Sequence, residues 1–388
     1  MTSPDVTRSL EAARALMPQI AATGEQGDRE RRLPRAAVDA LLDAGLFRML
    51  LSPAIGGGGA DLPAFLRVAE CVAQADGSAG WCLVQGSISA TQVAPYLPLH
   101  VARDVFDDAR TILSNGTGPT GRAVAVDGGY RLTGEWPFAS GCTHATWLKG
   151  ASLVYTTDGS PVLRADGVHE VRTFLFPAGS ATILDVWHVS GLRGTGSNTI
   201  TVTDLFVPPE RTVCLTHDPL QERTTLAELP YLSVAAVGFC AVAMGIARGA
   251  LDAFIELAAS KTPRGTKATL RDDPVVQLQV ARAEAQLRAA RALLFEATQD
   301  AWDTAQRDEM LSPTQRAVLR LAATSGIHQA AQVVDAAYHA AGATSIFEMQ
   351  PFERRFRDVH AVTQQTQAKR QHLQAVGRVF LGLDTEVS

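Results

Sequence analysis

Two aromatic residues, a hydroxyl residue and a glycine lie close together in the middle of the chain. They are Trp136, Phe138, Ser140 and Gly141, in the segment WPFASG. Aromatic side chains offer a flat wall to a ring-shaped ligand, a hydroxyl supplies one polar contact, and a glycine lets the backbone approach closely. The same residues would also suit a hairpin whose aromatic side chains only fill a core. Both interpretations stay open on this segment alone.

A β-hairpin is predicted to carry this segment. The alternating runs 122–126 and 130–133 are separated by Asp127-Gly128-Gly129, and an Asp-Gly pair between such runs is typical of a tight hairpin turn. Further short runs of the same kind are 147–154, 171–176 and 199–207. Because Gly, Asp, Pro and Ser clusters separate them, residues from about 111 to 213 are expected to form a small β-barrel or sandwich.

Helices are predicted on both sides of this β region. Residues 5–107 show helical spacing of apolar side chains, with a second helix expected to begin at Pro34 and to end at Gly45. The C-terminal part contains four long, Ala-rich segments: Val234–Ser260, Pro274–Asp303, Pro313–Ala341 and Arg354–Leu381. Segments of similar length suggest an antiparallel bundle. The predicted fold class is α+β, with a helical domain at 1–107, a β domain at 108–215 and a four-helix bundle at 225–388.

Composition narrows the classes of function. The 388 residues carry a net charge of −5 and no basic tract, so a nucleic acid partner is not expected. No apolar run of about 20 residues is present, and 234–247 is interpreted as a buried helix and not as a membrane span. The first residues lack the pattern of a signal peptide. The five cysteines are scattered, which predicts neither disulfides nor a metal site, and a cytoplasmic protein is expected.

Two glycine-rich segments have the composition of phosphate-binding loops. Gly56 to Gly59 lack the GxxxxGK[ST] pattern, which favours a flexible connection over a phosphate cradle. The segment RGTGSN at 193–198 precedes a predicted strand and not a helix, so a dinucleotide-binding interpretation fails.

The order of the predicted domains and several short motifs resemble the acyl-CoA dehydrogenase superfamily over essentially the whole chain. The motifs are LSNG at 113–116, WPFASG at 136–141, GLRGTGS at 191–197, LFVP at 205–208 and FRD at 356–358. The motif SGCTHATW at 140–147 resembles one that recurs in the branch of flavin-dependent, two-component (group D type) monooxygenases.

This resemblance implies a flavin site at the end of the hairpin. Phe138 matches an aromatic residue set against the isoalloxazine ring, and Ser140 matches a hydroxyl that bonds flavin N5. Ser114 and Asn115 would lie along the flavin pyrimidine. Trp81, Trp136 and Phe138 would exclude water from the reaction. Trp81 could also be an ordinary core residue.

The resemblance also implies that a neighbouring subunit completes the cofactor site. Arg264 falls roughly where the family offers an arginine to the cofactor phosphate of a neighbouring subunit, with Gln277 as a weaker companion. Arg264 could equally be a solvated loop cation. A homotetramer is the implied assembly, and the Ala-rich helices permit close packing between subunits.

The chain departs from its relatives at the expected catalytic base. Arg357-Asp358 is not followed by the glutamate of a dehydrogenase, and Gln365 stands where related hydroxylases carry a histidine. An amide does not titrate, so Gln365 cannot act as a base. Glu348 could replace the glutamate, while His144 and His360 are the nearest histidines. His144 could equally be a structural residue.

Three hypotheses follow. The first is a monooxygenase that takes reduced flavin (FMN or FAD) from a separate reductase and uses O2 to hydroxylate a small aromatic or electron-rich substrate. The second is an acyl-CoA dehydrogenase-like enzyme with permanently bound FAD. The third is a lyase or a binding protein that keeps the fold without redox chemistry.

Overall fold

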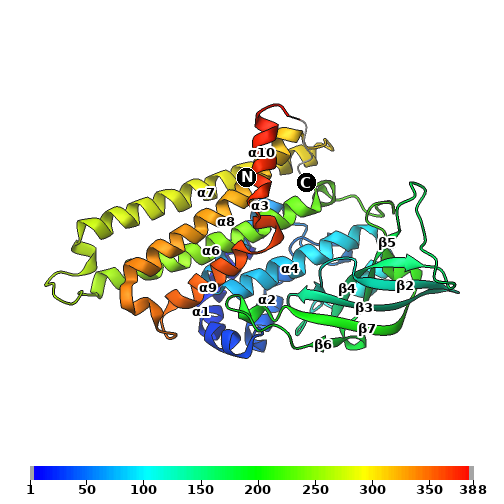
Figure 1. Cartoon of the computed structure of the whole chain (residues 1–388), viewed down its shortest axis with the longest axis horizontal. Coiled ribbons are helices and arrows are strands. Elements are labelled where there is room, and N and C mark those ends of the chain that lie inside the picture. Colours follow the sequence, from blue (N-terminus) through cyan, green and yellow to red (C-terminus); the bar gives the residue numbers. More distant parts are fainter. Residues whose placement is uncertain (1–3, 384–388) are drawn as a thin grey trace.

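The structure is a computed structural model that describes residues 4–383, and these form ten α-helices and eight β-strands (Figure 1). The helices are α1 (Pro4–Glu30), α2 (Arg35–Asp43), α3 (Leu62–Ala75), α4 (Gly77–Val93), α5 (Leu99–Phe106), α6 (Tyr231–Ser260), α7 (Pro274–Gln306), α8 (Pro313–Ala341), α9 (Pro351–Thr363) and α10 (Gln371–Phe380). The strands are β1 (Leu113–Asn115), β2 (Gly121–Val126), β3 (Gly129–Ala139), β4 (Trp147–Tyr155), β5 (Val171–Pro177), β6 (Thr182–Leu184), β7 (Asn198–Val207) and β8 (Thr212–Val213).

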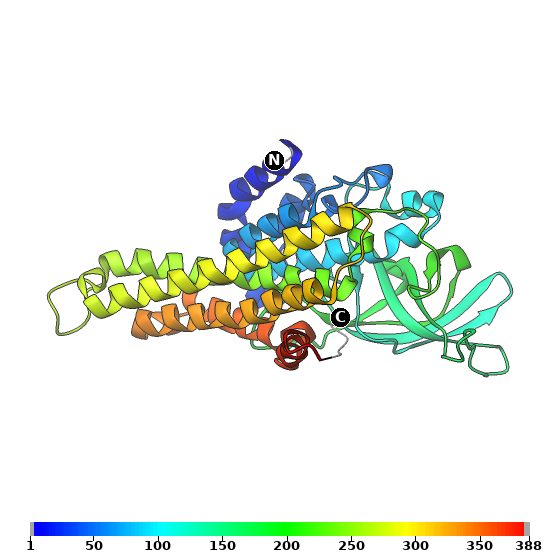
Figure 2. The ribbon, with the colours of Figure 1, turned by 90° about the horizontal axis from the view of Figure 1, so that it is seen from above.

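The sheet lies at one end of the long axis, and the long helices α6, α7 and α8 extend to the other end, where α6 connects to α7 (Figures 1 and 2). The N-terminal helices α3 and α4 pack against α6, so both helical parts share one hydrophobic core. The predicted α+β class is confirmed. The division into 1–107, 108–215 and 225–388 remains a prediction, and its outermost residues 1–3 and 384–388 lie outside the described residues.

All eight strands belong to one sheet, in the order β6-β7-β3-β2-β4-β5-β8, with β1 paired to β4. The predicted hairpin joins β2 to β3: Val126 pairs with Gly129, and Gly128 takes a φ of +74° in the turn between them. The central part of the sheet is therefore as the alternating runs indicate.

Trp136 has a structural place in this sheet. Its side chain is fully buried and its indole N–H donates to the Ala151 carbonyl at 2.7 Å. A Cβ at Gly121, Gly134 or Gly150 would lie 2.3–2.5 Å from atoms of the indole ring, so the neighbouring strands leave room for this ring by having no side chains there. The prediction that Trp136 helps to wall a ligand site is wrong, because the ring fills the core of the sheet.

The apolar segment at 234–247 forms part of a buried helix, as predicted. Helix α6 is long and apolar enough to cross a membrane by length and composition, but 94% of its most apolar window is buried by the rest of the protein. Three glycines allow the closest contacts: Gly245 approaches the Glu70 carbonyl, Gly238 approaches Val84, and Gly249 approaches the Gln74 carbonyl. These contacts fix α3 and α4 against the central helix.

Two predictions about connections are corrected by the structure. The fourth long helix, expected at Arg354–Leu381, is interrupted between α9 and α10 by a short 3-10 turn, Thr366–Ala368. The run Gly56–Gly59 is a tightly held loop and not a flexible one. The Arg48 guanidinium donates to the carbonyls of Ile55 and Gly56, and a Cβ at Gly57 would lie 2.0 Å from the Leu51 carbonyl oxygen.

Candidate functional site

Strand β3 ends in an irregular segment that exposes Phe138. The pairing with β7 shifts register between Trp136 and Ala139, and Phe138 has a φ of +59°, which is costly for a residue with a side chain. The Phe138 ring is 57% exposed and meets Trp187 edge to face, with ring centroids 6.0 Å apart. A strained backbone that presents an aromatic ring to the surface is typical of a ligand site.

Ser140 follows directly and belongs to a chain of buried hydrogen bonds. The Trp81 indole N–H donates to the Ser140 hydroxyl oxygen at 3.0 Å. The Ser140 and Ser197 hydroxyl oxygens are 2.7 Å apart, and those of Ser197 and Thr195 are 2.6 Å apart. The Thr195 hydroxyl donates to the Leu192 carbonyl at 2.8 Å.

The chemistry of these groups fixes the direction of every bond in the chain. A hydroxyl has one proton, and that of Thr195 goes to the Leu192 carbonyl, so Ser197 must donate to Thr195. Ser140 must in turn donate to Ser197, because the single Ser197 proton already goes to Thr195, and Ser140 accepts from the Trp81 indole N–H. If the Ser140 proton turns to a ligand, only its bond to Ser197 is lost, and the bonds that Trp81, Ser197 and Thr195 donate are kept.

Trp81 is held rigidly behind Ser140. It lies on α4 and is 8% exposed, and it stacks on Phe239 of α6 at a centroid distance of 4.4 Å and an interplanar angle of 11°. Parallel stacking and one hydrogen bond fix both the plane and the edge of the indole. Trp81 was predicted either to shield the reaction from water or to be an ordinary core residue. The structure shows a core residue whose indole N–H also contacts Ser140.

Ser114 and Asn115 lie on β1 beside this chain. The Ser114 hydroxyl donates to the Ser140 carbonyl at 2.8 Å. The Asn115 side chain accepts a hydrogen bond from the Ser89 hydroxyl of α4 and donates to the Gly116 carbonyl. The structure thus brings together four of the predicted site residues (Ser114, Asn115, Phe138 and Ser140) with Trp81.

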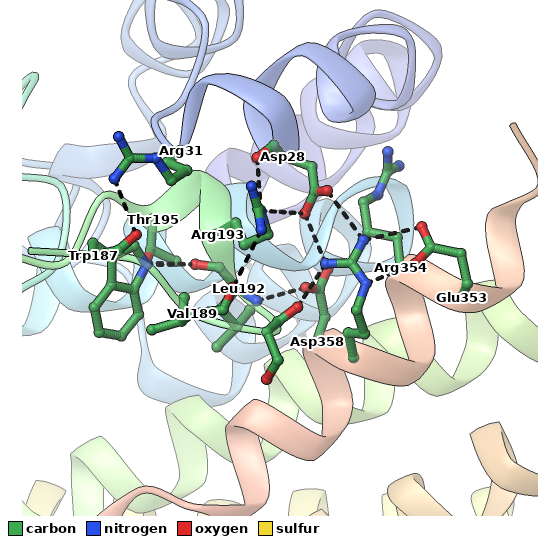
Figure 3. A network of polar contacts seen from close by, with 12 residues as sticks. Asp28, Arg31, Trp187, Val189, Leu192, Arg193, Thr195, Glu353, Arg354 and Asp358 are labelled. Atoms are coloured by element: carbon green, nitrogen blue, oxygen red, sulfur yellow. Dashed lines mark hydrogen bonds and ion pairs between the residues drawn. The ribbon is translucent and has the colours of Figure 1, made fainter. Parts of the chain in front are cut away.

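The loop that carries Thr195 and Ser197 is held by a network of ion pairs (Figure 3). Arg193 donates to the Asp28 carbonyl at 3.0 Å, and Arg357 makes a bidentate pair with the Asp28 carboxylate at 3.0 and 3.1 Å. Arg357 also bonds Glu353 at 2.6 Å. Burial lowers the pKa of Arg357, but the hydrogen bonds that it donates to the Glu353 and Asp28 carboxylates, together with their charges, outweigh this effect and raise the pKa. These contacts join α1, the loop and α9.

A second contact fixes the strained start of the same loop. The Leu192 backbone N–H donates to the Asp358 carboxylate at 2.6 Å, and Leu192 has a φ of +52°. Burial, followed by the nearby Asp76 charge, raises the pKa of Asp358 to about 7. The Arg-Asp pair of the FRD motif therefore positions the loop of Ser197 and does not itself reach Ser140.

His144 is close to this segment but has a different environment. Both ring nitrogens are buried and have no hydrogen-bond partner among residues 4–383. Burial, with a smaller effect of the Arg35 charge, lowers the pKa of His144 to about 4. The ring is therefore neutral at pH 7. It packs closely against Gly141, since a Cβ placed at Gly141 would lie 2.9 Å from the His144 Nε2. A catalytic role and a role in ordering the loop both remain predictions.

The other candidates for a base are placed less favourably. The Gln365 side-chain oxygen accepts from the Gln367 backbone at 2.6 Å, while its buried nitrogen has no partner among the described residues. His360 is paired with Asp335 at 2.9 Å, and Glu348 is exposed beside Arg354 and Arg357. No contact between these three residues and Ser140 is found in the part of the chain that the structure describes.

Arg264 and Gln277 lie far from Ser140 within one chain. Arg264 is in the connection between α6 and α7, and Gln277 is in the first turn of α7, at the end of the molecule opposite the sheet (Figure 1). Gln277 is exposed and donates to the Arg271 carbonyl at 2.9 Å. One chain therefore does not bring these residues to the Phe138 segment.

Thr195, Ser197 and Ser89 belong to the site, although the sequence motifs did not predict them. Thr195 and Ser197 stand in the RGTGSN segment, whose glycines suggest only a comparison with nucleotide-binding loops. Their hydroxyl side chains were the only feature of the sequence that could have pointed to a role in hydrogen bonding. Ser89 had no signal, because only the packing of α4 on β1 brings it to Asn115.

Comparisons with known proteins agree with this fold and site. The family "Acyl-CoA dehydrogenase, N-terminal domain" matches residues 7–96, and "Acyl-CoA dehydrogenase, C-terminal domain" matches residues 237–370. Indole-3-acetate monooxygenase of Pseudomonas putida is 31% identical, over 92% of this chain and 89% of that protein. The flavin-dependent monooxygenase oxygenase subunit HsaA of Rhodococcus jostii is also 31% identical, over 89% of this chain and 91% of that protein.

A solved structure extends the similarity to three dimensions. XiaF of Streptomyces, in complex with FADH2 and glycerol, has a TM-score of 0.88 at 26% identity and covers 99% of this chain and 97% of its own. The fold and the β3 segment define a protein of the acyl-CoA dehydrogenase class. Within this class, the chain belongs to the family of flavin-dependent monooxygenases.

Proposed function

We propose that this protein is the oxygenase component of a two-component system, which binds reduced flavin from a separate reductase and hydroxylates a small aromatic substrate with O2. The observation that carries the proposal is the directed hydrogen-bond chain ending at Ser140, next to the exposed ring of Phe138. The names of the relatives support it: an oxygenase subunit, a monooxygenase of an aromatic acid, and a complex with reduced flavin.

The residues present fit a flavin. Phe138 offers an aromatic face, and the Ser140 hydroxyl can donate a hydrogen bond to a ring nitrogen while still accepting one from Trp81. Bound reduced flavin would supply the electrons with which O2 is split between the hydroxylated substrate and water. The chain would hold the ring, direct one proton from Ser140, and keep water away from that side with the stacked Trp81 and Phe239.

The second part of the proposal is that copies of this chain complete each cofactor site in a homotetramer. Arg264 and Gln277 lie at the end of the molecule opposite the sheet, whereas Phe138 lies at the end of strand β3, so they could contact the same flavin only from another copy. The proposal also places the protein in the cytoplasm, because its five cysteines are free and buried and form no disulfides. Mixing Ser140→Ala subunits with Arg264→Ala subunits should restore part of the activity through hybrid sites if two copies share each site.

The test of the main proposal is anaerobic mixing with reduced FMN or FAD, followed by rapid exposure to O2. We expect an absorbing species distinct from both reduced and oxidised flavin, and we expect it to decay several-fold faster in Ser140→Ala. Ser180→Ala, which removes an exposed hydroxyl elsewhere in the β region, is the matched control. Tightly held oxidised FAD that acyl-CoA esters reduce would instead support a dehydrogenase, and the lack of any flavin binding would support a non-redox protein.

A further inference from the structure

Lys149 is a buried cation without an acidic partner. Its side chain is 2% exposed, and no carboxylate forms an ion pair with it among residues 4–383. Its ammonium group donates to the Ser89 carbonyl at 2.9 Å and to the Gln92 side-chain oxygen. An ammonium group has three donors, and these two neutral acceptors leave the charge itself uncompensated. Burial accordingly lowers the pKa of Lys149 to about 7.

The sheet places Lys149 next to the residues of the candidate site. Along β4, Leu148 faces the core around Trp136, and Lys149 faces the opposite side, toward α4. Lys149 pairs with Asn115 of the neighbouring strand β1, and Ser89 contacts both residues. The buried charge is therefore one strand away from the segment assigned to the flavin.

A cavity is lined by two neighbours of Lys149, although Lys149 itself is not among its lining residues. It has a volume of about 250 Å³ between α4, the 3-10 turn Thr225–Glu228 and the start of α6. Gln92 and Tyr231 line it, and both are neighbours of Lys149: Gln92 accepts its hydrogen bond, and the Tyr231 ring centre is 6.0 Å from the ammonium nitrogen. The remaining lining residues include Thr91, Tyr96, Leu226, Leu229 and Val234.

The groups around this cavity favour an anion on an aromatic or apolar body. Burial raises the pKa of Tyr231 to about 12, so its hydroxyl stays protonated and can donate. The first turn of the 30-residue helix α6 begins at Tyr231, and backbone N–H groups at a helix start attract negative charge. The leucine and valine side chains provide an apolar wall for a ring.

We propose that this cavity binds the substrate by an anionic oxygen, a carboxylate or a phenolate on an aromatic ring, with Lys149, which is hydrogen-bonded to the lining residue Gln92, as its counter-charge. The term substrate rests on the function proposed above. Lys149 is thus a specificity residue that would select acidic aromatic compounds and hold them beside the flavin segment. The same charge would hold a phenol in its ionised form, a task for which Gln365 offers no titrating group.

Binding of matched acid and neutral compounds, without flavin, tests this proposal. The probes are phenylacetate against methyl phenylacetate and phenol against anisole, with affinities measured by calorimetry. The wild-type protein should prefer at least one anionic member over its neutral partner by about tenfold or more. The carboxylate pair and the phenol pair tell which oxygen the site takes. Equal binding of the members in both pairs, or no binding of any probe, would overturn the proposal.

Substitution of Lys149 makes the test specific. Lys149→Met keeps the length of the side chain and should abolish the preference for the acidic member while leaving the affinity for the neutral ester or ether unchanged. Lys261→Met is the control, because Lys261 also bonds a carbonyl and a neutral side chain (Ala341 and Thr344) but lies at the far end of α6. A loss shared equally by acid and neutral probes would mean that Lys149 is only structural.

Flavin binding is measured separately, so that failure of the proposed function can be told from failure of the anion site. Reduced flavin binding should be the same in the wild-type protein and in Lys149→Met. If acids bind through Lys149 but no flavin binds in any state, the proposed function fails and the anion site stands. If flavin binds and reacts with O2 but acids are not preferred, only the anion site fails. The wild-type comparison decides the question even if Lys149→Met does not fold.

Discussion

The two ends of helix α4 differ in how the buried charged groups near them are compensated. At its N-terminal end, Asp76 caps the helix by accepting from the Ala79 N–H, the Asp28 carboxylate forms an ion pair with Arg357, and the Asp358 carboxylate accepts from the Leu192 N–H. At its C-terminal end, Lys149 has only neutral acceptors and a neighbouring cavity. Paired charges fix a structure, whereas an unpaired buried charge costs stability unless a ligand neutralises it. The difference agrees with a positioning role for the first end and with the anion-binding role proposed for the second.

The largest expected effect concerns the pH dependence of stability that Lys149 causes. Folding lowers its pKa to about 7, while the unfolded side chain keeps its proton up to about pH 10. Between these values the unfolded chain binds the extra proton, so wild-type stability relative to Lys149→Met should rise with pH. The rise should reach about 4 kcal/mol between pH 6 and 10, measured by urea unfolding of both proteins. A difference that stays constant with pH would contradict an uncompensated charge.

At the paired end, Arg357→Met should lower the free energy of unfolding by about 3 kcal/mol, because Asp28 and Glu353 lose a shared partner in a half-buried site. Urea unfolding at pH 7 measures this loss. Arg29→Met is the matched control, since Arg29 and its partner Glu25 are both exposed, and a change below about 0.5 kcal/mol is expected. Equal effects of the two substitutions would show that the network does not stabilise the loop.

A smaller effect is expected from the hydrogen bond between Trp81 and Ser140. Trp81→Phe keeps an aromatic ring on Phe239 but removes the indole N–H that Ser140 accepts. Trp302→Phe provides the baseline, because Trp302 is a buried tryptophan of α7 with no hydrogen bond found among the described residues. Trp81→Phe should cost about 1 kcal/mol more than this baseline in thermal unfolding. A cost no larger than that of Trp302→Phe would remove the anchoring role of Trp81.

The smallest effect tests the strain at Phe138. Because Phe138 has a positive φ and an exposed ring, Phe138→Gly should leave stability unchanged or raise it by about 0.5 kcal/mol. Phe206→Gly on β7, where the backbone is an ordinary strand, should instead destabilise the protein. Both variants are compared by urea unfolding. A loss of more than about 1 kcal/mol for Phe138→Gly would show that the ring stabilises the fold and is not kept for a ligand.

Local patterns predicted much of the architecture. The Asp127-Gly128 turn, the alternation along β2 and β4, and the long helices α6 to α8 all follow from short-range periodicity and turn chemistry. The interruption between α9 and α10 was not predicted, because Gln, Thr and Ala are compatible with a helix. There the Thr324 hydroxyl donates to the Gln367 carbonyl, and Arg320 bonds the Gln367 side chain. A contact from another helix thus decides this backbone.

The candidate site was predicted less completely. Phe138 and Ser140 have residue types that point to a ring ligand, and their neighbours Ser114 and Asn115 could be placed by resemblance. Trp136 has the same type as a wall residue, yet it fills the sheet core, because the direction of a side chain depends on the pleat and on which face is covered. The type of a residue alone does not show whether its side chain lines a ligand site or fills the hydrophobic core.

The sequence by itself determined the hairpin, the order of helical and β regions and the presence of an aromatic and hydroxyl segment at a strand end, since these depend on neighbours within a few residues. Only the tertiary structure decided that Ser197 continues the hydrogen-bond chain of Ser140, 57 residues away, and that Lys149 faces α4 without an acid. Both facts arise from packing between distant segments, where burial sets the cost of a charge and geometry sets the partner of a proton.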